Sequence, residues 1–222
     1  MSDTTIRELT SIEEFEACMD LQRDGFGWSD LELMPMRFFV VSRHIGGLVL
    51  GAFEESTLVG FLSAIPGVKD GVPYWHSHML AVQRDRRDSG IGFQLKQVQK
   101  ERALKQGIRL IEWTFDPLAS RNAYFNIEKL GVIVRRYYPG FYGGDNDRLI
   151  AEWWLERPRP TVGGDRRRVS ISAESDPASR LRVRDEFLAN LKDDYYVAAF
   201  ERQGETSDYI FVRGASHADQ PD

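Results

Sequence analysis

The sequence predicts an α/β fold, in which helices cover a mixed (α+β) sheet and a C-terminal helix-hairpin extension follows. The first observation is the order of the apolar repeats, which alternate between the helical and the strand period along the first two-thirds of the chain. The second is a strand-helix-strand pattern that occurs twice. This pattern predicts parallel pairing in the middle of an otherwise antiparallel sheet. The third is a Pro- and Gly-rich stretch, residues 156–168, that predicts a boundary.

The elements follow from local signals. Ser11 and Glu14 form a capping box at the start of the first helix, which ends near Gly25. A polar turn joins two β-rich runs into a hairpin, and Gly131 suits the end of a later helix. The expected order is strand 5–9, helix 12–25, helix 30–43, strands 48–53 and 58–65, loop 66–73, strand 74–82, helix 90–106, strand 108–115, helix 120–130, and strands 132–138 and 148–155.

The chain divides into an expected domain over residues 1–157 and an extension over residues 158–222. The extension begins with a linker that contains three consecutive arginines, residues 166–168. Asp176 and Pro177 suit the start of a helix, a hairpin follows over 195–212, and residues 214–222 read as a frayed tail. Two roles stay open for this extension: covering a substrate cleft or making a homodimer contact.

Composition excludes several classes of function. Lys and Arg total 29 against 34 Asp and Glu, so the net charge of −5 disfavours nucleic acid and anionic membranes as partners. Residues 38–41 are typical of the longest apolar stretches, which are far too short to cross a bilayer. The lone Cys18 fits a reducing cytosol and reads as a core residue rather than a catalytic thiol, so we expect a cytoplasmic protein.

The most informative segment, residues 82–92, is a strand end, a basic turn and a Gly-containing helix start. Free amides at a helix N-terminus favour an anion, and Gly90 and Gly92 allow its close approach to the backbone. Arg84, Arg86 and Arg87 concentrate positive charge here. The alternative is a solvated turn with chance glycines, and the spacing suits neither a P-loop nor a dinucleotide fingerprint.

This turn resembles the Gln/Arg-x-x-Gly-x-Gly/Ala motif of the GNAT superfamily of acyl-CoA-dependent N-acyltransferases. The matching residues are Arg87, Asp88, Ser89, Gly90, Ile91 and Gly92. A second segment, Glu128-Lys129-Leu130-Gly131-Val132, resembles a later motif of that family. Segments 115–123 and 138–143 further resemble a branch of predicted acetyltransferases without a firm substrate. The resemblance covers roughly residues 5–155 and implies a GNAT-like fold.

The resemblance also implies a donor site for acetyl-CoA, the co-substrate. The turn's amides would bind the coenzyme A pyrophosphate. The fourth and fifth strands would splay apart to admit pantetheine, to which Leu80, Ala81 and Val82 offer backbone groups. Asn122 or Asn126 would bond the cofactor, with surface solubility as an equal alternative. No metal is implied, and a metal site at His76 and His78 is disfavoured because no Cys or further His lies nearby.

Acyl transfer to an amine needs a neutral amine, a polarised carbonyl and a protonated leaving thiolate. His76, His78 and Glu112 are the candidate bases, although Glu112 equally suits a pair with an arginine. The family often has a Tyr four residues before the Gly of the second motif, where this chain has Ile127. Tyr124 is the nearest substitute, with packing on the sheet as the stronger alternative.

The acceptor cleft is expected to be built from residues 25–43, the strand that carries His76 and the aromatic loop 137–142. Phe26, Trp28, Tyr137, Phe141 and Tyr142 are the candidate lining residues, of which Trp28 and Tyr142 are favoured. The expected function is transfer of an acetyl group to a primary amine of a small molecule in a ternary complex. The alternatives are a non-catalytic acyl-CoA-binding module, or an acyltransferase using a longer acyl-CoA or a protein N-terminus.

Overall fold

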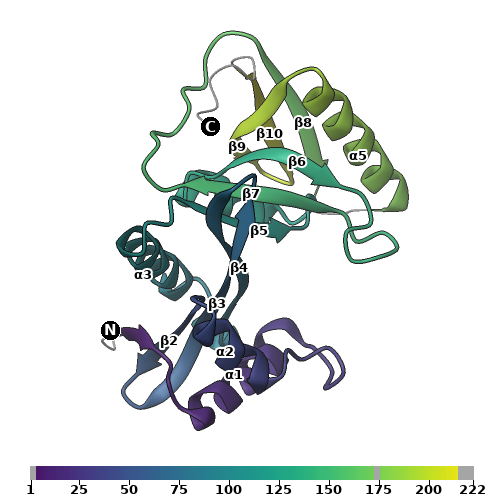
Figure 1. Ribbon diagram of the computed structural model, residues 1–222. Coiled ribbons are helices and arrows are strands. Elements are labelled where there is room, and N and C mark those ends of the chain that lie inside the picture. Colours follow the sequence, from purple (N-terminus) through teal and green to yellow (C-terminus); the bar gives the residue numbers. More distant parts are fainter. Residues whose placement is uncertain (1–3, 173–175, 215–222) are drawn as a thin grey trace. The chain divides into compact units, whose positions relative to one another are not determined.

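The computed structural model describes residues 4–172 and 176–214, which divide into two compact units between residues 111 and 112. The fold is mixed α/β, as the sequence predicts (Figure 1). Apart from Gly214, whose amide donates to the Asp194 carbonyl over 2.7 Å, the expected tail lies outside the described residues.

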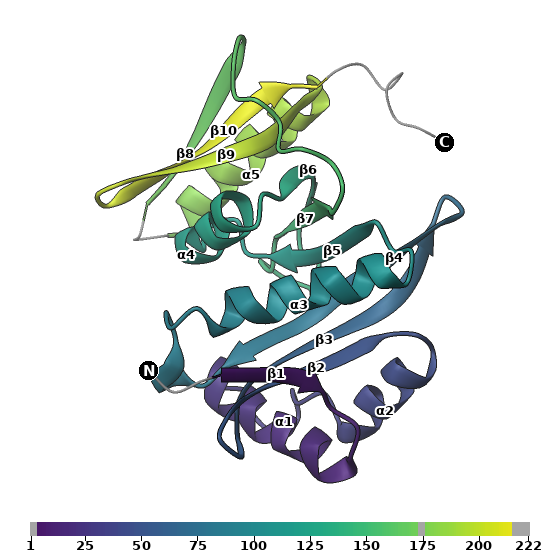
Figure 2. The ribbon, with the colours of Figure 1, turned by 90° about the vertical axis from the view of Figure 1, so that its left-hand side faces the viewer.

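The first unit is built on an antiparallel sheet in the order β1-β2-β3-β4. Figure 2 shows α1 and α2 on one face of this sheet and α3 on the other. The elements are β1 (Thr4–Glu8), α1 (Ile12–Phe26), α2 (Met36–His44), β2 (Leu48–Glu54), β3 (Thr57–Lys69), β4 (Val72–Val82), the 3-10 turn η1 (Arg84–Arg86) and α3 (Ile91–Lys105).

The first helix begins and ends as its residues predict. Ser11 accepts from the Glu14 amide over 3.3 Å, and the Glu14 carboxylate accepts from the Ser11 amide over 3.1 Å, which completes the capping box. The second helix begins at Met36 rather than near residue 30, because Pro35 occupies its N-cap with an extended backbone. Between the helices and the sheet, fully buried Phe15, Phe39 and Cys18 belong to one apolar core.

The prediction of a loop over residues 66–73 is wrong. Strand β3 continues to Lys69 and pairs with β4, which starts at Val72. Asp70 and Gly71 form a two-residue turn and both have positive φ, 50° and 78°. Asp-Gly is a favoured hairpin dipeptide because its backbone twist matches that of the flanking strands.

Strand β4 contains an irregularity at the centre of the candidate site. Ser63 of β3 is opposite Met79, whereas Ala64 is opposite Ser77, so His78 is the extra residue between them. A β-bulge of this kind redirects side chains locally. It brings His78 within 5.2 Å of Phe38 of α2, measured between ring centres.

In the second unit the strand order is β5-β7-β6-β9-β10-β8, with antiparallel registers between β6 and β7, β9 and β10, and β10 and β8. Helix α5 packs on β6, β8 and β9. The elements are β5 (Leu110–Phe115), which begins in the first unit, α4 (Ser120–Ala123), the π-helical segment η2 (Tyr124–Lys129), β6 (Ile133–Tyr138), β7 (Arg148–Trp154), β8 (Arg166–Ser172), α5 (Pro177–Lys192), β9 (Tyr195–Gln203) and β10 (Thr206–Arg213).

The three arginines assigned to a linker instead begin strand β8. Val169 and Ile171 are buried, and Arg168 pairs with Glu201 over 3.0 Å and with Asp208 over 2.9 Å. Cross-strand charge pairs therefore accommodate a basic run that looks like solvated loop in the sequence. The proposed domain boundary at residue 157 stays a prediction.

Candidate functional site

The turn before α3 has the backbone of an anion-binding site. Asp88 has φ 65° and Gly90 has φ 91°, so the chain reverses through two left-handed residues just before the helix begins at Ile91. The first amides of a helix have no intrahelical acceptor, and turns of this type gather such amides into a concave nest. The residues present therefore fit a phosphate group held by backbone amides.

The arginines of this turn bond to other groups of the protein. The Arg84 amide donates to the Asp24 carboxylate over 2.9 Å, and its Nε donates to the Asp24 carbonyl over 2.6 Å. Arg87 donates to the carbonyl of Gly25, and Arg86 pairs with Glu54 over 2.9 Å. These bonds fasten the turn to the end of α1 and to the end of β2, so the case for an anion rests on the amides more than on free guanidinium groups.

Strand β4 leads directly into this turn. A Cβ added at Gly92 would lie 3.8 Å from Leu80 and 3.9 Å from Val82, so these two residues face the start of α3. Ala81 points to the opposite face, where an added Cβ on Gly25 would lie 3.2 Å from it. The strand end thus packs closely between two helices.

His76 and His78 lie close together on β4, with ring centres 6.0 Å apart. Burial lowers the pKa of His76 to about 4, with added effects of His78 and Lys96, and burial also lowers the pKa of His78. Both rings are therefore neutral near pH 7 and able to accept a proton. The shift is larger for His76, which makes His78 the stronger base.

A buried polar network lies behind the histidines and was missed by sequence reasoning. Lys96 of α3 is 2% exposed, and its Nζ donates to Ser77 Oγ over 2.8 Å. Ser77 Oγ contacts Gln99 Oε1 at 3.3 Å, and burial lowers the pKa of Lys96 well below its usual value. In the sequence a lysine on this helix looks solvent-exposed, so no signal pointed to it.

Trp28 is half-buried after α1 and packs against the core under the first two helices. Its ring centre lies 4.5 Å from that of Phe26. Its place near the helix end agrees with a lining role, which stays a prediction.

The remaining candidates lie in the second unit. Glu112 is buried and paired with Arg136, which also bonds Glu152 over 3.2 Å. The alternative of an arginine partner is therefore the one seen in the structure. The Glu112 carboxylate is therefore engaged in an ion pair within the protein.

The π-helical segment carries the other candidates. Tyr124 is half-buried, with the Arg202 guanidinium 5.0 Å and the Lys129 ammonium 5.5 Å from its ring centre. Asn126 is buried and accepts from Trp113 Nε1 over 3.2 Å, whereas Asn122 is exposed. Of the two asparagines, Asn122 is thus the one open to a ligand.

The loop between β6 and β7 carries exposed rings. Tyr142 is 57% exposed, and its hydroxyl lies 3.2 Å from Thr114 Oγ1. Phe141 packs edge-on against Tyr142 at 4.8 Å and against Tyr138 at 5.6 Å. Tyr137, in contrast, is buried and donates to Asp147 over 2.5 Å, so it belongs to the core rather than to an open cleft.

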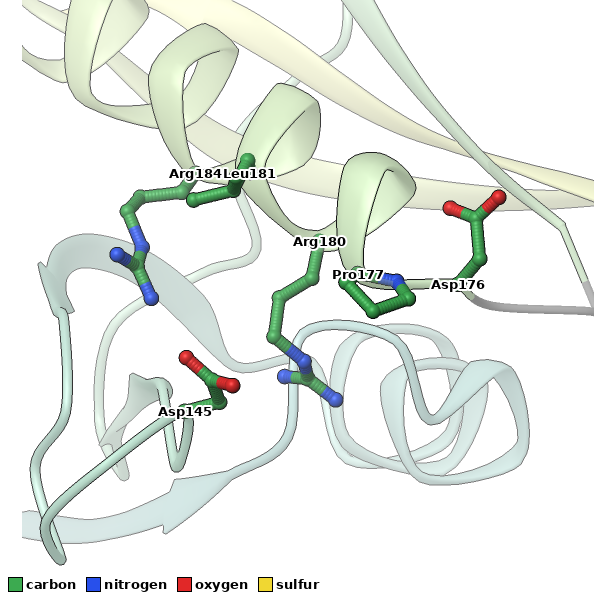
Figure 3. Close-up of a pocket in the computed structure, with 6 residues that line it drawn as sticks. All are labelled: Asp145, Asp176, Pro177, Arg180, Leu181 and Arg184. Atoms are coloured by element: carbon green, nitrogen blue, oxygen red, sulfur yellow. The ribbon is translucent and has the colours of Figure 1, made fainter.

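A hollow of about 280 Å³ lies between α5 and this loop (Figure 3). It is lined by Asp145, Asp176, Pro177, Arg180, Leu181 and Arg184. The described residues contain no group of three or more His, Cys, Asp or Glu arranged to hold a metal ion. Within the same residues, every helix is too short or too polar to cross a membrane.

Comparisons with known proteins identify the fold. A solved aminoglycoside 6'-N-acetyltransferase from Enterococcus faecium is 21% identical, covers 71% of this chain and 99% of its own, and has a TM-score of 0.55. An acetyltransferase from Elizabethkingia anophelis, solved with acetyl-CoA bound, is 15% identical over 69% of this chain and 99% of its own, with a TM-score of 0.53. The ribosomal-protein-S18-alanine N-acetyltransferase from Escherichia coli is 19% identical over 70% and 96%, with a TM-score of 0.52.

No curated protein matches the sequence. The model of the acetyltransferase (GNAT) family matches residues 13–131, more than half of the chain, and this range contains the turn before α3. The chain therefore belongs to the acetyltransferase (GNAT) family.

Proposed function

We propose that this protein transfers an acetyl group from acetyl-CoA to a primary amine of a small molecule, by direct transfer in a ternary complex. The observation that carries the proposal is the left-handed backbone of Asp88 and Gly90 in the turn just before α3 begins, which supports a role of the first amides of this helix in holding an anion. The coenzyme A pyrophosphate is the anion that this family implies. Acetyl-CoA supplies the acetyl group as an activated thioester.

The residues of β4 and its turn have distinct roles in this proposal. The amides of residues 88–92 hold the pyrophosphate, and the backbone of residues 80–82 offers hydrogen bonds to pantetheine. Asn122, which is exposed, is the candidate side chain for a further bond to the cofactor.

In the reaction, a C–N bond forms between the amine and the thioester carbonyl carbon while the C–S bond breaks. His78, assisted by His76, accepts the proton that the amine loses, either directly or through water. Tyr124 is the candidate to donate a proton to the leaving thiolate. Holding both reactants together supplies much of the rate enhancement.

Turnover of a panel of amines, followed by release of the coenzyme A thiol, tests the proposal. Turnover of small primary amines with acetyl-CoA, and its loss in His78→Gln, is the expected result. Turnover only with longer acyl-CoAs or with peptide N-termini would contradict the proposed substrates but support the same type of acyl transfer.

A second candidate is a non-catalytic acyl-CoA-binding module. The observation that favours it is Ile127, which is fully buried at the position where the family often has a catalytic tyrosine. Acetyl-CoA binding without turnover of any amine, peptide or acyl-CoA in the panel would support this candidate and contradict the first.

A further inference from the structure

The C-terminal extension and the loop between β6 and β7 share one buried carboxylate. Asp147 is 0% exposed and ends this loop. Its oxygens accept from Tyr137 Oη over 2.5 Å, from the Gly140 amide over 2.9 Å, and from Arg184 Nε and Nη2 over 3.0 and 2.8 Å. One carboxylate therefore connects the end of β6, the loop backbone and helix α5.

The loop that Asp147 holds carries exposed rings. Tyr138, Phe141 and Tyr142 are 41%, 43% and 57% exposed and pack edge-on against one another. The loop backbone turns through Gly140, Gly143 and Gly144, all with positive φ. Bonds such as that from the Gly143 amide to the Gly140 carbonyl, over 2.8 Å, close turns within this Gly-rich loop, and bonds to its surroundings hold the loop and its rings in place.

Helix α5 is a rigid support for this loop. Phe187 is fully buried against Tyr137, Tyr209 and Phe211, with ring centres 5.4, 4.9 and 5.0 Å apart. Figure 3 shows Arg184 and Arg180 directed from α5 to the same side, toward the loop residue Asp145. One turn before Arg184, Arg180 contacts both oxygens of Asp116 at 3.4 Å.

We propose that the extension positions the acceptor-binding surface, and that Arg184 is the positioning residue. Through Asp147, Arg184 fixes the three exposed rings as a surface for an amine with an aromatic or otherwise apolar carbon skeleton. Rings of this kind offer apolar contact area, and their faces attract the ammonium group of an arriving amine. The inference rests on the proposed function, since it assigns the acceptor of that reaction.

The geometry singles out Arg184 from its neighbours. Its planar guanidinium bonds both oxygens of Asp147, which a lysine cannot reproduce with its single ammonium group. Arg182 lies on the same helix but pairs with exposed Glu186 and the Ser170 carbonyl. Arg182→Lys is therefore a matched control for Arg184→Lys.

Hydrogen exchange of the full-length protein tests the positioning step without any substrate. In Arg184→Lys the amides of residues 140–147 should exchange roughly tenfold faster, while those of residues 83–92 keep the parent rate. Arg182→Lys should match the parent in both segments. Tyr137→Phe removes a single hydrogen bond to the same carboxylate. If Arg184→Lys fails to fold, this variant should show the faster amide exchange in the same loop.

Kinetics with phenethylamine and ethanolamine test the acceptor class. The parent should prefer phenethylamine, Phe141→Ala should remove the preference, and Arg184→Lys should raise the KM for phenethylamine about tenfold. The KM for acetyl-CoA should stay at the parent value in both variants. If Arg184 had a merely structural role, Arg184→Lys would change the KM values of the two amines equally.

Unchanged loop exchange in Arg184→Lys, an equal effect of Arg182→Lys, or a parent that prefers ethanolamine would overturn the inference. Acetyl-CoA binding without turnover of either amine would overturn the assignment of the rings to an acceptor. A parent that fails to bind acetyl-CoA would instead contradict the proposed function, whatever the loop exchange shows.

Discussion

Replacement of His76 by Gln should remove a large part of the acid sensitivity of the fold. The pKa of His76 is lowered from 6.5 to about 4. Burial is the largest cause, and the charges of His78 and Lys96 add to it. Between these values the unfolded chain binds a proton that the folded chain does not. The free energy of unfolding therefore falls as pH decreases from about 6.5 to about 4.

The magnitude follows from the size of the shift. Each pH unit inside this window costs at most about 1.4 kcal/mol, so His76 alone should account for about 2.5 kcal/mol of the stability lost between pH 7 and pH 4.5. His76→Gln has no group that titrates there, so its loss of stability over the same interval should be smaller by that amount.

Urea unfolding of the parent and the variant at pH 7 and pH 4.5 measures the difference. His44→Gln removes a histidine from the exposed end of α2 and controls for a surface substitution. Equal losses of stability in the parent and in His76→Gln would show that His76 binds its proton with the same pKa in the folded and the unfolded chain, and would refute the lowered pKa of this buried histidine.

Three further substitutions test the first unit. Phe39→Ala removes a fully buried ring that lies 6.1 Å from Phe15 and 5.8 Å from Phe61, so urea unfolding at pH 7 should show a loss of about 3–5 kcal/mol; a loss below about 1 kcal/mol would contradict this core. Gly47→Ala would place a Cβ 2.4 Å from the Ala64 carbonyl oxygen, so its melting temperature should drop clearly, and an unchanged value would argue against this packing. Lys96→Met removes a buried amine whose pKa is lowered, so the stability of this variant relative to the parent should rise as pH falls from 10 to 7; a constant difference would show that the amine is charged inside the fold.

Local chemistry made much of the fold predictable. The capping box, the hairpin turns and the proline at the start of α5 depend on residues close in sequence, and the structure places them as expected. The same reasoning failed over residues 66–73, where Pro66, Gly67 and Pro73 suggested a loop. The Asp70-Gly71 turn was the signal for a longer hairpin, and it was outweighed by those residues.

Tertiary contacts decided what the sequence could not show. Arg168 is accommodated in β8 because it pairs with Asp208 of the neighbouring strand β10 and with Glu201 of β9. The bulge at His78 depends on the register with β3, and the place of Lys96 depends on which face of α3 meets the sheet. None of these pairings has a signature in a single segment, whereas the Gly-containing turn before α3 does.

The most direct test of the donor site compares two glycines at opposite ends of α3. Gly90 and Gly107 have φ of 91° and 77°, and an added Cβ meets no atom within 4 Å at either position, so an aspartate introduces similar strain and charge at both. Only Gly90 lies in the turn that we assign to the pyrophosphate.

The measurement is the melting temperature with acetyl-CoA added. At about 100 times its dissociation constant the ligand adds roughly 2.7 kcal/mol, which corresponds to a rise of roughly 5–10 °C for a chain of this size. The account predicts this rise in the parent and in Gly107→Asp but not in Gly90→Asp. No rise in the parent with millimolar acetyl-CoA or longer acyl-CoAs, or an equal rise in Gly90→Asp, would contradict it.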